Sequence, residues 1–258
     1  MSGIKCEIKD HIAYVTLARP DALNCFNFAM LHQLGEVVES LHVDPKARVI
    51  IFTGEGEKAF SAGADLKERR TLTEAEVRRN VKKIGDVFQS IADLPQPTIA
   101  AINGYAFGGG FELMLACDFR YAVADTKMGL TETSWGIIPG AGGTQRLPRL
   151  IGDMKAKELI LTAKKLTSQE AYEYGLLMEV VEREHLIGRC ERLASLLLSN
   201  GPVAVQQAKY AINKGAEVDL GTGLAIESKA YEITIPTSDR LEALEAFRDK
   251  RAPHFTGK

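Results

Sequence analysis

The sequence predicts a mixed α/β fold whose strands and helices alternate, followed by a region built almost only of helices. Two observations carry this prediction. Short β-rich segments alternate with apolar patterns of 3.6-residue period along the first part of the chain, as in folds with crossover helices. From about residue 142 onward strand patterns largely stop, except at 178–182. No linker separates the two parts, so we expect an α/β core over residues 1–195 and a helical region over 196–258.

The first elements expected are a β-hairpin, a helix and a strand. Residues 4–9 and 11–17 are two β-rich runs separated by Asp10, a pattern that predicts a hairpin. Residues 28–42 place apolar side chains on one face of a helix. Residues 47–54 are a compact apolar segment that ends in glycine, which predicts the next strand.

The middle of the chain is expected to repeat this alternation. Thr73 is followed three residues later by Glu76, which is a capping box, and the periodicity of residues 73–92 predicts a helix from that point. We expect strands over 97–104 and 118–124, with a short buried helix after Gly110 between them. Further helices are expected over residues 153–163, 168–175, 184–199, 202–215, 219–233 and 238–249.

Composition and charge exclude several functional classes. The chain has 258 residues, enough for one large domain or one with a small appendage. Its 32 basic and 34 acidic residues give a net charge of −2, which provides no global field for nucleic acid or a membrane surface. No apolar run reaches the ~18 residues of a membrane span, and we expect no membrane partner.

The cysteines and the N-terminal segment predict a cytoplasmic protein. Residues 1–10 have neither the basic-then-apolar pattern of a signal peptide nor the composition of a transit peptide. The four cysteines contain no CxxC pair and are expected to be reduced thiols. They are Cys6, Cys25, Cys117 and Cys190.

Glycine is concentrated in one stretch, because nine of the 23 glycines fall between Gly104 and Gly143. Gly108–Gly110 directly precede a predicted helix, where unpaired N–H groups lie at the positive end of the helix dipole. That arrangement suits a ligand phosphate or a developing oxyanion. The alternative is a tight turn packed against a neighbouring segment.

Two isolated acids lie in the same stretch. Glu112 stands in an otherwise apolar run, either as a first-turn acid favoured by the helix dipole or as a buried acid with a raised pKa. Glu132 stands between two threonines and is either an exposed loop acid or the partner of Glu112. Two carboxyls that converge beside N–H donors predict proton-transfer chemistry. All five histidines lie outside this stretch, so no Ser-His or Cys-His system is expected.

Three segments together resemble the enoyl-CoA hydratase/isomerase (crotonase) superfamily. They are AGADLKE (62–68), NGYAFGGGFELMLACD (103–118) and ETSWGIIPGAGGTQRL (132–147), and the similarity extends over essentially the whole chain. The resemblance implies an α/β fold of the ClpP/crotonase-like class, a spiral of ββα units with a helical C-terminal trimerisation region.

The resemblance also implies an active site. The amides of Ala64 and Gly109 match the oxyanion hole that holds the thioester carbonyl in this family. Glu112 and Glu132 match the two catalytic glutamates: the acid at Glu132 donates a proton to C2, and Glu112 activates or orients the water for C3. Gly140 matches a backbone position near the acyl group and water.

Further positions match the family's CoA-binding residues. Lys67 matches a partner for the nucleotide phosphates, whereas Asp21 stands where some relatives carry a basic residue. The full set of matching substrate- and CoA-binding positions is Ala62, Ala64, Asp65, Leu66, Lys67, Gly109, Gly140, Phe247 and Lys250. No metal and no separate cofactor are expected, since coenzyme A is part of the substrate.

The resemblance implies a homotrimer, or a homohexamer made of two trimers. Phe247 and Lys250 match positions that reach a neighbour's CoA adenine; the alternative for them is an amphipathic helix residue and a solvated lysine. Some relatives bind RNA through a basic helix near the N-terminus, but residues 26–43 carry no lysine or arginine. RNA binding is therefore not expected.

The pair of glutamates selects among the family's activities. Isomerases commonly keep only the second glutamate, so retention of both favours a hydro-lyase acting on a trans-2-enoyl-CoA, as in fatty acid metabolism. GADLKER (63–69) and the segment IPTSDRLEALEAFRDKR (235–251) resemble the methylglutaconyl-CoA hydratase branch of leucine degradation, which stays open as an alternative, as does an isomerase.

Phe111 and Trp135 predict an apolar acyl pocket. An inert scaffold is disfavoured, because it needs neither the acids nor the glycine loops.

Overall fold

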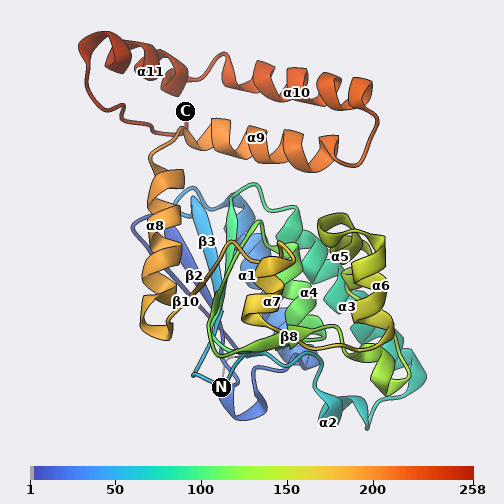
Figure 1. Ribbon diagram of the computed structural model, residues 1–258. Coiled ribbons are helices and arrows are strands. Elements are labelled where there is room, and N and C mark those ends of the chain that lie inside the picture. The colour runs from blue at the N-terminus through green and yellow to red at the C-terminus, as the bar shows by residue number, and fades with distance from the viewer. Residues whose placement is uncertain (1–2) are drawn as a thin grey trace. The chain divides into compact units, whose positions relative to one another are not determined.

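The computed structural model describes residues 3–258 and divides the chain into two compact units (Figure 1). Unit 1 comprises the residues up to Leu94 together with Thr98–Glu191, and unit 2 comprises Pro95–Pro97 and Arg192–Lys258. The sequence places the boundary after residue 195, and the structure places it after Glu191.

Unit 1 is built on a six-stranded sheet with the order β1-β2-β3-β5-β7-β10. β1 pairs antiparallel with β2, as the hairpin pattern predicts, and all the other neighbours are parallel. The turn residues Asp10 and His11 have φ values of 48° and 65°. The strands are β1 (Ile4–Lys9), β2 (Ile12–Leu17), β3 (Val49–Gly54), β5 (Thr98–Ile102), β7 (Phe119–Val123) and β10 (Glu179–Val181).

A second sheet has four very short strands in the order β4-β6-β8-β9, of which only β9 is antiparallel to its neighbour. These strands cannot be predicted from the sequence, because two or three residues are too few to show an alternating pattern. They are β4 (Ala59–Ser61), β6 (Tyr105–Phe107), β8 (Lys127–Gly129) and β9 (Leu166–Thr167).

The two sheets together form a spiral of ββα units, which confirms the expected fold. β3 is followed by β4 and a helix, β5 by β6 and a helix, and β7 by β8 and a helix. The spatial order β3-β5-β7 in one sheet repeats as β4-β6-β8 in the other. The helices that close these units are α2 (Leu66–Arg69), α3 (Glu74–Ala92), α4 (Gly109–Ala116) and α5 (Gly143–Ile151).

The core of unit 1 lies between the larger sheet and its helices. α1 (Phe28–Val43) buries its apolar face as the 3.6-residue period predicts, and Asn27 caps it by accepting a hydrogen bond from the amide of Met30 at 2.9 Å. α3 begins at the predicted capping box of Thr73 and Glu76. Phe26 and Phe88 pack edge to face with ring centroids 5.5 Å apart. These contacts fix α1 and α3 beside the loops that follow the strands.

The remaining helices match the predicted ranges to within a few residues. They are α6 (Asp153–Leu161), α7 (Ser168–Glu173), α8 (Leu186–Leu198), α9 (Pro202–Gly215), α10 (Leu220–Thr234) and α11 (Ser238–Asp249), with the 3₁₀ turns η1 (Pro20–Ala22), η2 (Glu132–Trp135) and η3 (Arg183–His185).

In unit 2, α9 and α10 lie side by side (Figure 1), and the chain end is fixed to α11. The buried Asp239 carboxylate accepts hydrogen bonds from the amides of Thr256 and Gly257 at 2.7 and 2.8 Å. Across residues 3–258, no helix is both long enough and apolar enough to cross a membrane.

Candidate active site

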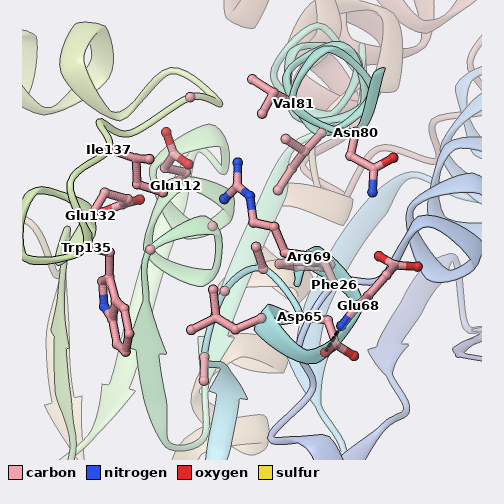
Figure 2. A pocket seen from close by; sticks show the side chains of 18 of the residues that line it. Phe26, Asp65, Glu68, Arg69, Asn80, Val81, Glu112, Glu132, Trp135 and Ile137 are labelled. Carbon is pink, nitrogen blue, oxygen red and sulfur yellow. Dashed lines mark hydrogen bonds between the residues drawn. The ribbon is translucent and has the colours of Figure 1, made fainter. Parts of the chain in front are cut away.

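Unit 1 contains a cavity of about 580 Å³ that is lined by loops and by residues of α1, α2, α3 and α4 (Figure 2). The loops are those that follow β4, β6 and β8. The lining residues are Phe26, Leu31, Ala62, Gly63, Ala64, Asp65, Leu66, Glu68, Arg69, Leu72, Asn80, Val81, Ile84, Gly108, Gly109, Glu112, Thr131, Glu132, Trp135, Ile137, Ile138 and Gly140.

The loop after β4 is held by backbone pairing to Phe26. The Phe26 amide donates to the Gly63 carbonyl at 2.8 Å, and the Asp65 amide donates to the Phe26 carbonyl at 2.9 Å. The Asp65 carboxylate then caps α2 by accepting from the amides of Lys67 and Glu68. Ala64, between these contacts, keeps an amide with no hydrogen-bond acceptor among residues 3–258.

The Asp65 carboxylate is charged as well as structural. It pairs with the guanidinium of Arg19, with Nη2 and Oδ2 2.9 Å apart. Burial alone would raise the pKa of this carboxyl, but the hydrogen bond and charge of Arg19 hold it below its usual range. Asp65 is therefore a fixed anion that positions the loop.

The glycine triplet forms the start of α4. Gly108 has φ 52° and ψ −122°, a conformation that side chains other than glycine rarely adopt, and it caps the helix. A Cβ atom on Gly110 would overlap the carbonyl oxygen of Ser61, so the helix and the end of β4 touch through backbone. Gly109 is the first residue of α4, where an amide has no partner within the helix, and none is found for it in the described chain.

The loops after β4 and β6 approach each other at the two unpaired amides. A Cβ atom on Gly63 would lie 3.1 Å from the Gly109 nitrogen. Ala64 follows Gly63, so the amides of Ala64 and Gly109 belong to two segments in backbone contact at the cavity wall. The structure thus brings together the two amides that the family resemblance assigns to the oxyanion hole.

Glu112 is almost completely buried, with 3% of its surface exposed. Its Oε1 accepts hydrogen bonds from the amides of Ala141 and Gly143 at 2.7 and 2.8 Å. Burial raises the pKa of this carboxyl; the two amides and the charge of Arg146 oppose that rise. Of the two interpretations of Glu112, the structure favours the buried acid with a raised pKa.

Arg146 fixes the loop that holds Glu112, a role the sequence analysis does not predict. Its Nη1 donates to the Ala141 carbonyl at 2.9 Å, and its Nη2 donates to Gln89 Oε1 at 2.7 Å. The guanidinium therefore joins α5 and α3 across the loop whose amides bind Glu112.

Glu132 begins η2 and points into the same cavity (Figure 2). Its Oε2 is buried and has no hydrogen-bond partner in the part of the chain that the structure describes. Burial, followed by the nearby charge of Glu112, raises the pKa of Glu132 to about 7. A Cβ atom on Gly108 would lie 3.3 Å from Glu132 Oε1, so this carboxyl lies beside the glycine turn.

The two carboxyls have different environments although both line one cavity. Glu112 is oriented by two amides, whereas Glu132 has a free oxygen and is about half protonated near neutral pH. Such a pair can orient a water molecule on one side and exchange a proton on the other.

Most of the predicted site residues line the cavity. These are Ala62, Ala64, Asp65, Leu66, Gly109, Glu112, Glu132 and Gly140. Lys67 lies on the exposed face of α2 and does not line it, nor does the exposed Asp21. Phe247 is 86% exposed on α11 and Lys250 follows that helix; neither lines this cavity.

The apolar wall is only partly as predicted. Trp135 lines the cavity, but Phe111 does not, because it is fully buried in the hydrophobic core. Adjacent residues on a helix point about 100° apart, so Glu112 and Phe111 cannot face the same space. Val81 and Ile84 of α3 and Ile137 supply the apolar surface instead.

Arg69 is a cavity residue that the sequence analysis misses. It stands next to last in the charged run DLKERR (65–70), which has the composition of a solvated helix face. No spacing distinguishes it from Arg70. Among residues 3–258, no group of three or more His, Cys, Asp and Glu side chains could hold a metal ion.

Comparisons with known proteins show the family of the chain. The enoyl-CoA hydratase/isomerase family matches residues 7–258. YngF of Bacillus subtilis (strain 168) is 53% identical over 248 residues, covering 96% of this chain and 95% of the relative. Human mitochondrial methylglutaconyl-CoA hydratase is 49% identical over 251 residues, covering 96% of this chain and 74% of the relative.

A solved structure has the same fold throughout. The enoyl-CoA hydratase from Bacillus anthracis superposes with a TM-score of 0.97 at 49% sequence identity, and the match covers 100% of both chains. The similarity of sequence and of structure spans the strands, the glycine turn and both glutamate-bearing segments. The chain therefore belongs to the enoyl-CoA hydratase/isomerase family of the crotonase superfamily.

Proposed function

We propose that this enzyme is an enoyl-CoA hydratase, which adds water syn across the 2,3 double bond of a trans-2-enoyl-CoA. One observation carries the proposal: the buried Glu112 and the half-buried Glu132 line one cavity, and burial with the charge of Glu112 raises the pKa of Glu132 to about 7. Hydration needs both a group that orients water and a group that donates a proton near neutral pH.

In this proposal the thioester carbonyl oxygen accepts hydrogen bonds from the amides of Ala64 and Gly109. Both N–H groups lack acceptors in the described chain and lie on adjoining segments. Two such donors stabilise the negative charge that develops on the carbonyl oxygen as the double bond is attacked. The dipole of α4 adds to this effect, because Gly109 is its first residue.

The two glutamates then divide the proton transfers. Glu112, oriented by the Ala141 and Gly143 amides, accepts a proton from the water whose oxygen bonds to C3. The π electrons move towards C2 and the carbonyl, and Glu132 in its protonated form donates a proton to C2. The product is a 3-hydroxyacyl-CoA. Glu112 is then protonated and Glu132 is ionised, and a proton passes from Glu112 to Glu132 through water to restore the starting state.

The remaining contacts concern coenzyme A and assembly. The exposed ammonium group of Lys67 is available for a nucleotide phosphate, and Gly140 lies on the cavity wall for the acyl group and water. We propose a homotrimer or homohexamer in which Phe247 and Lys250 contact a neighbour's substrate. The cytoplasmic location likewise stays a prediction.

The glutamates test the proposal directly. Glu112→Gln and Glu132→Gln each keep the side-chain shape but remove the proton-transfer group, so each should lower kcat for crotonyl-CoA hydration by about 10²- to 10⁴-fold. The Kd for coenzyme A should change little. Glu39→Gln, an exposed change on α1, is the matched control. Full activity in either cavity variant would refute the mechanism.

A second substrate is supported by one relative and one residue. The human relative at 49% identity is named a methylglutaconyl-CoA hydratase, and the cavity contains an arginine. An acyl chain with its own carboxylate would need such a cation.

A further inference from the structure

Arg69 is the one basic side chain among the cavity-lining residues of the described chain. It ends α2 and is half-buried. Figure 2 shows its side chain extending across the cavity towards Glu112 and Glu132. The other charged lining residues are acids, so without Arg69 the cavity would repel an anionic acyl group.

The acids near Arg69 on α2 already have partners. Asp65 pairs with Arg19 at 2.9 Å, and Glu68 accepts a hydrogen bond from the Phe28 amide at 3.0 Å. The Arg69 guanidinium itself makes no ion pair or side-chain hydrogen bond with any residue in the range 3–258. Its five N–H donors are therefore available to a ligand.

The position of the guanidinium relative to Glu132 limits what that ligand is. The charge of Arg69 partly opposes the rise in the pKa of Glu132, yet the two side chains form no ion pair. The cation thus lies near the reacting end of the cavity but separated from the acids. A group that enters between them is the acyl portion of a substrate rather than its nucleotide.

We infer that Arg69 binds the terminal carboxylate of a short acyl chain, so that the preferred substrate is a 2-enoyl thioester whose carboxylate lies close to the double bond. The inference rests on the proposed hydratase function. A planar guanidinium binds a carboxylate through two parallel hydrogen bonds, which gives both affinity and orientation. An alkyl chain in the same place would shield the guanidinium from water without accepting its hydrogen bonds, which is unfavourable.

The test compares glutaconyl-CoA, which has the terminal carboxylate, with the neutral trans-2-hexenoyl-CoA. We expect the wild-type enzyme to have the higher kcat/KM for glutaconyl-CoA. Arg69→Met should lower the ratio of the two kcat/KM values by roughly 10- to 100-fold, mainly through KM. Arg69→Lys should retain part of the preference, because it keeps the charge but not the paired hydrogen bonds.

Arg70→Met is the matched control, since it removes the same charge from the adjacent exposed residue, which does not line the cavity. It should leave the ratio unchanged. An equal loss for both substrates in Arg69→Met would overturn the inference, because Arg69 would then act through Glu132 or on coenzyme A. A wild-type preference for hexenoyl-CoA would also overturn it.

A binding measurement separates this inference from the proposed function. The dissociation constants of the saturated thioesters glutaryl-CoA and hexanoyl-CoA, measured by calorimetry, do not depend on turnover. Arg69→Met should weaken glutaryl-CoA selectively, and equal weakening of both would contradict the role of Arg69. A protein that hydrates neither enoyl thioester would refute the proposed function, while the calorimetry would still decide the role of Arg69.

Discussion

Glu112 and Glu132 are the same residue type in two different environments. Glu112 accepts two hydrogen bonds from backbone amides, whereas Glu132 keeps a buried oxygen without a partner in the described chain. The sequence predicts both acids, because each is isolated among uncharged residues. It does not predict the amides of Ala141 and Gly143, since only the folded chain brings residues about thirty positions apart into contact with Glu112.

Arg69, by contrast, could not be predicted as a cavity residue. Its charge stands in a run of charged residues, so local sequence offers no reason to place it in a cavity. Only the folded position of the short helix α2 shows that Arg69 lines the cavity and that Arg70 is exposed to solvent.

The raised pKa of Glu132 predicts a pH dependence of stability. The folded value of about 7 exceeds the ordinary 4.5, so the native state binds more protons than the unfolded state between these values. The contribution of Glu132 is therefore most favourable below about pH 4.5 and is lost as the pH rises through 7. Its upper limit is about 3 kcal/mol, and partial exposure reduces it.

Glu132→Gln removes this titration. Denaturant unfolding should show the variant more stable than wild type at pH 8, with a difference that shrinks towards pH 5. A difference that is constant with pH would show that Glu132 titrates normally.

At the scale of elements, the length of each segment decides what could be predicted. The long amphipathic helices α1, α3 and α8–α11 repeat their pattern over several turns, and their predicted ranges are confirmed. β4, β6, β8 and β9 have two or three residues each and show no period. These short strands nevertheless position the site, because β4 and β6 end at the two loops that carry the unpaired amides.

The turn from β6 into α4 gives a test of the Gly109 amide. Gly109→Pro removes the N–H, and proline is tolerated at the first position of a helix. We expect a folded protein whose kcat is about 10²- to 10³-fold lower, the loss typical of one oxyanion donor.

Gly109→Ala is the control for this turn. Both variants add a Cβ atom 3.0 Å from Ile84 Cδ1, but alanine keeps the N–H. Turnover in the proline variant equal to that of the alanine variant would show that the amide takes no part in catalysis.

At the scale of the whole molecule, unit 2 exposes many large apolar side chains on its helices. Among them are Ile212 at 71%, Leu220 at 78% and Tyr231 at 66% exposed. Apolar surface of this kind is typical of an interface. Light scattering should therefore give a mass of about three or six times 28.2 kDa; a species of 28.2 kDa would contradict the expected assembly.

A hydratase adds the oxygen of water to its substrate, whereas an isomerase does not. The most direct measurement is mass spectrometry of the product formed from crotonyl-CoA in water labelled with the heavy oxygen isotope. A hydratase yields 3-hydroxybutyryl-CoA with one labelled oxygen at C3, and Glu132→Gln should abolish most of this incorporation. A product that carries no labelled oxygen and only a displaced double bond would contradict the account and show that the enzyme is an isomerase.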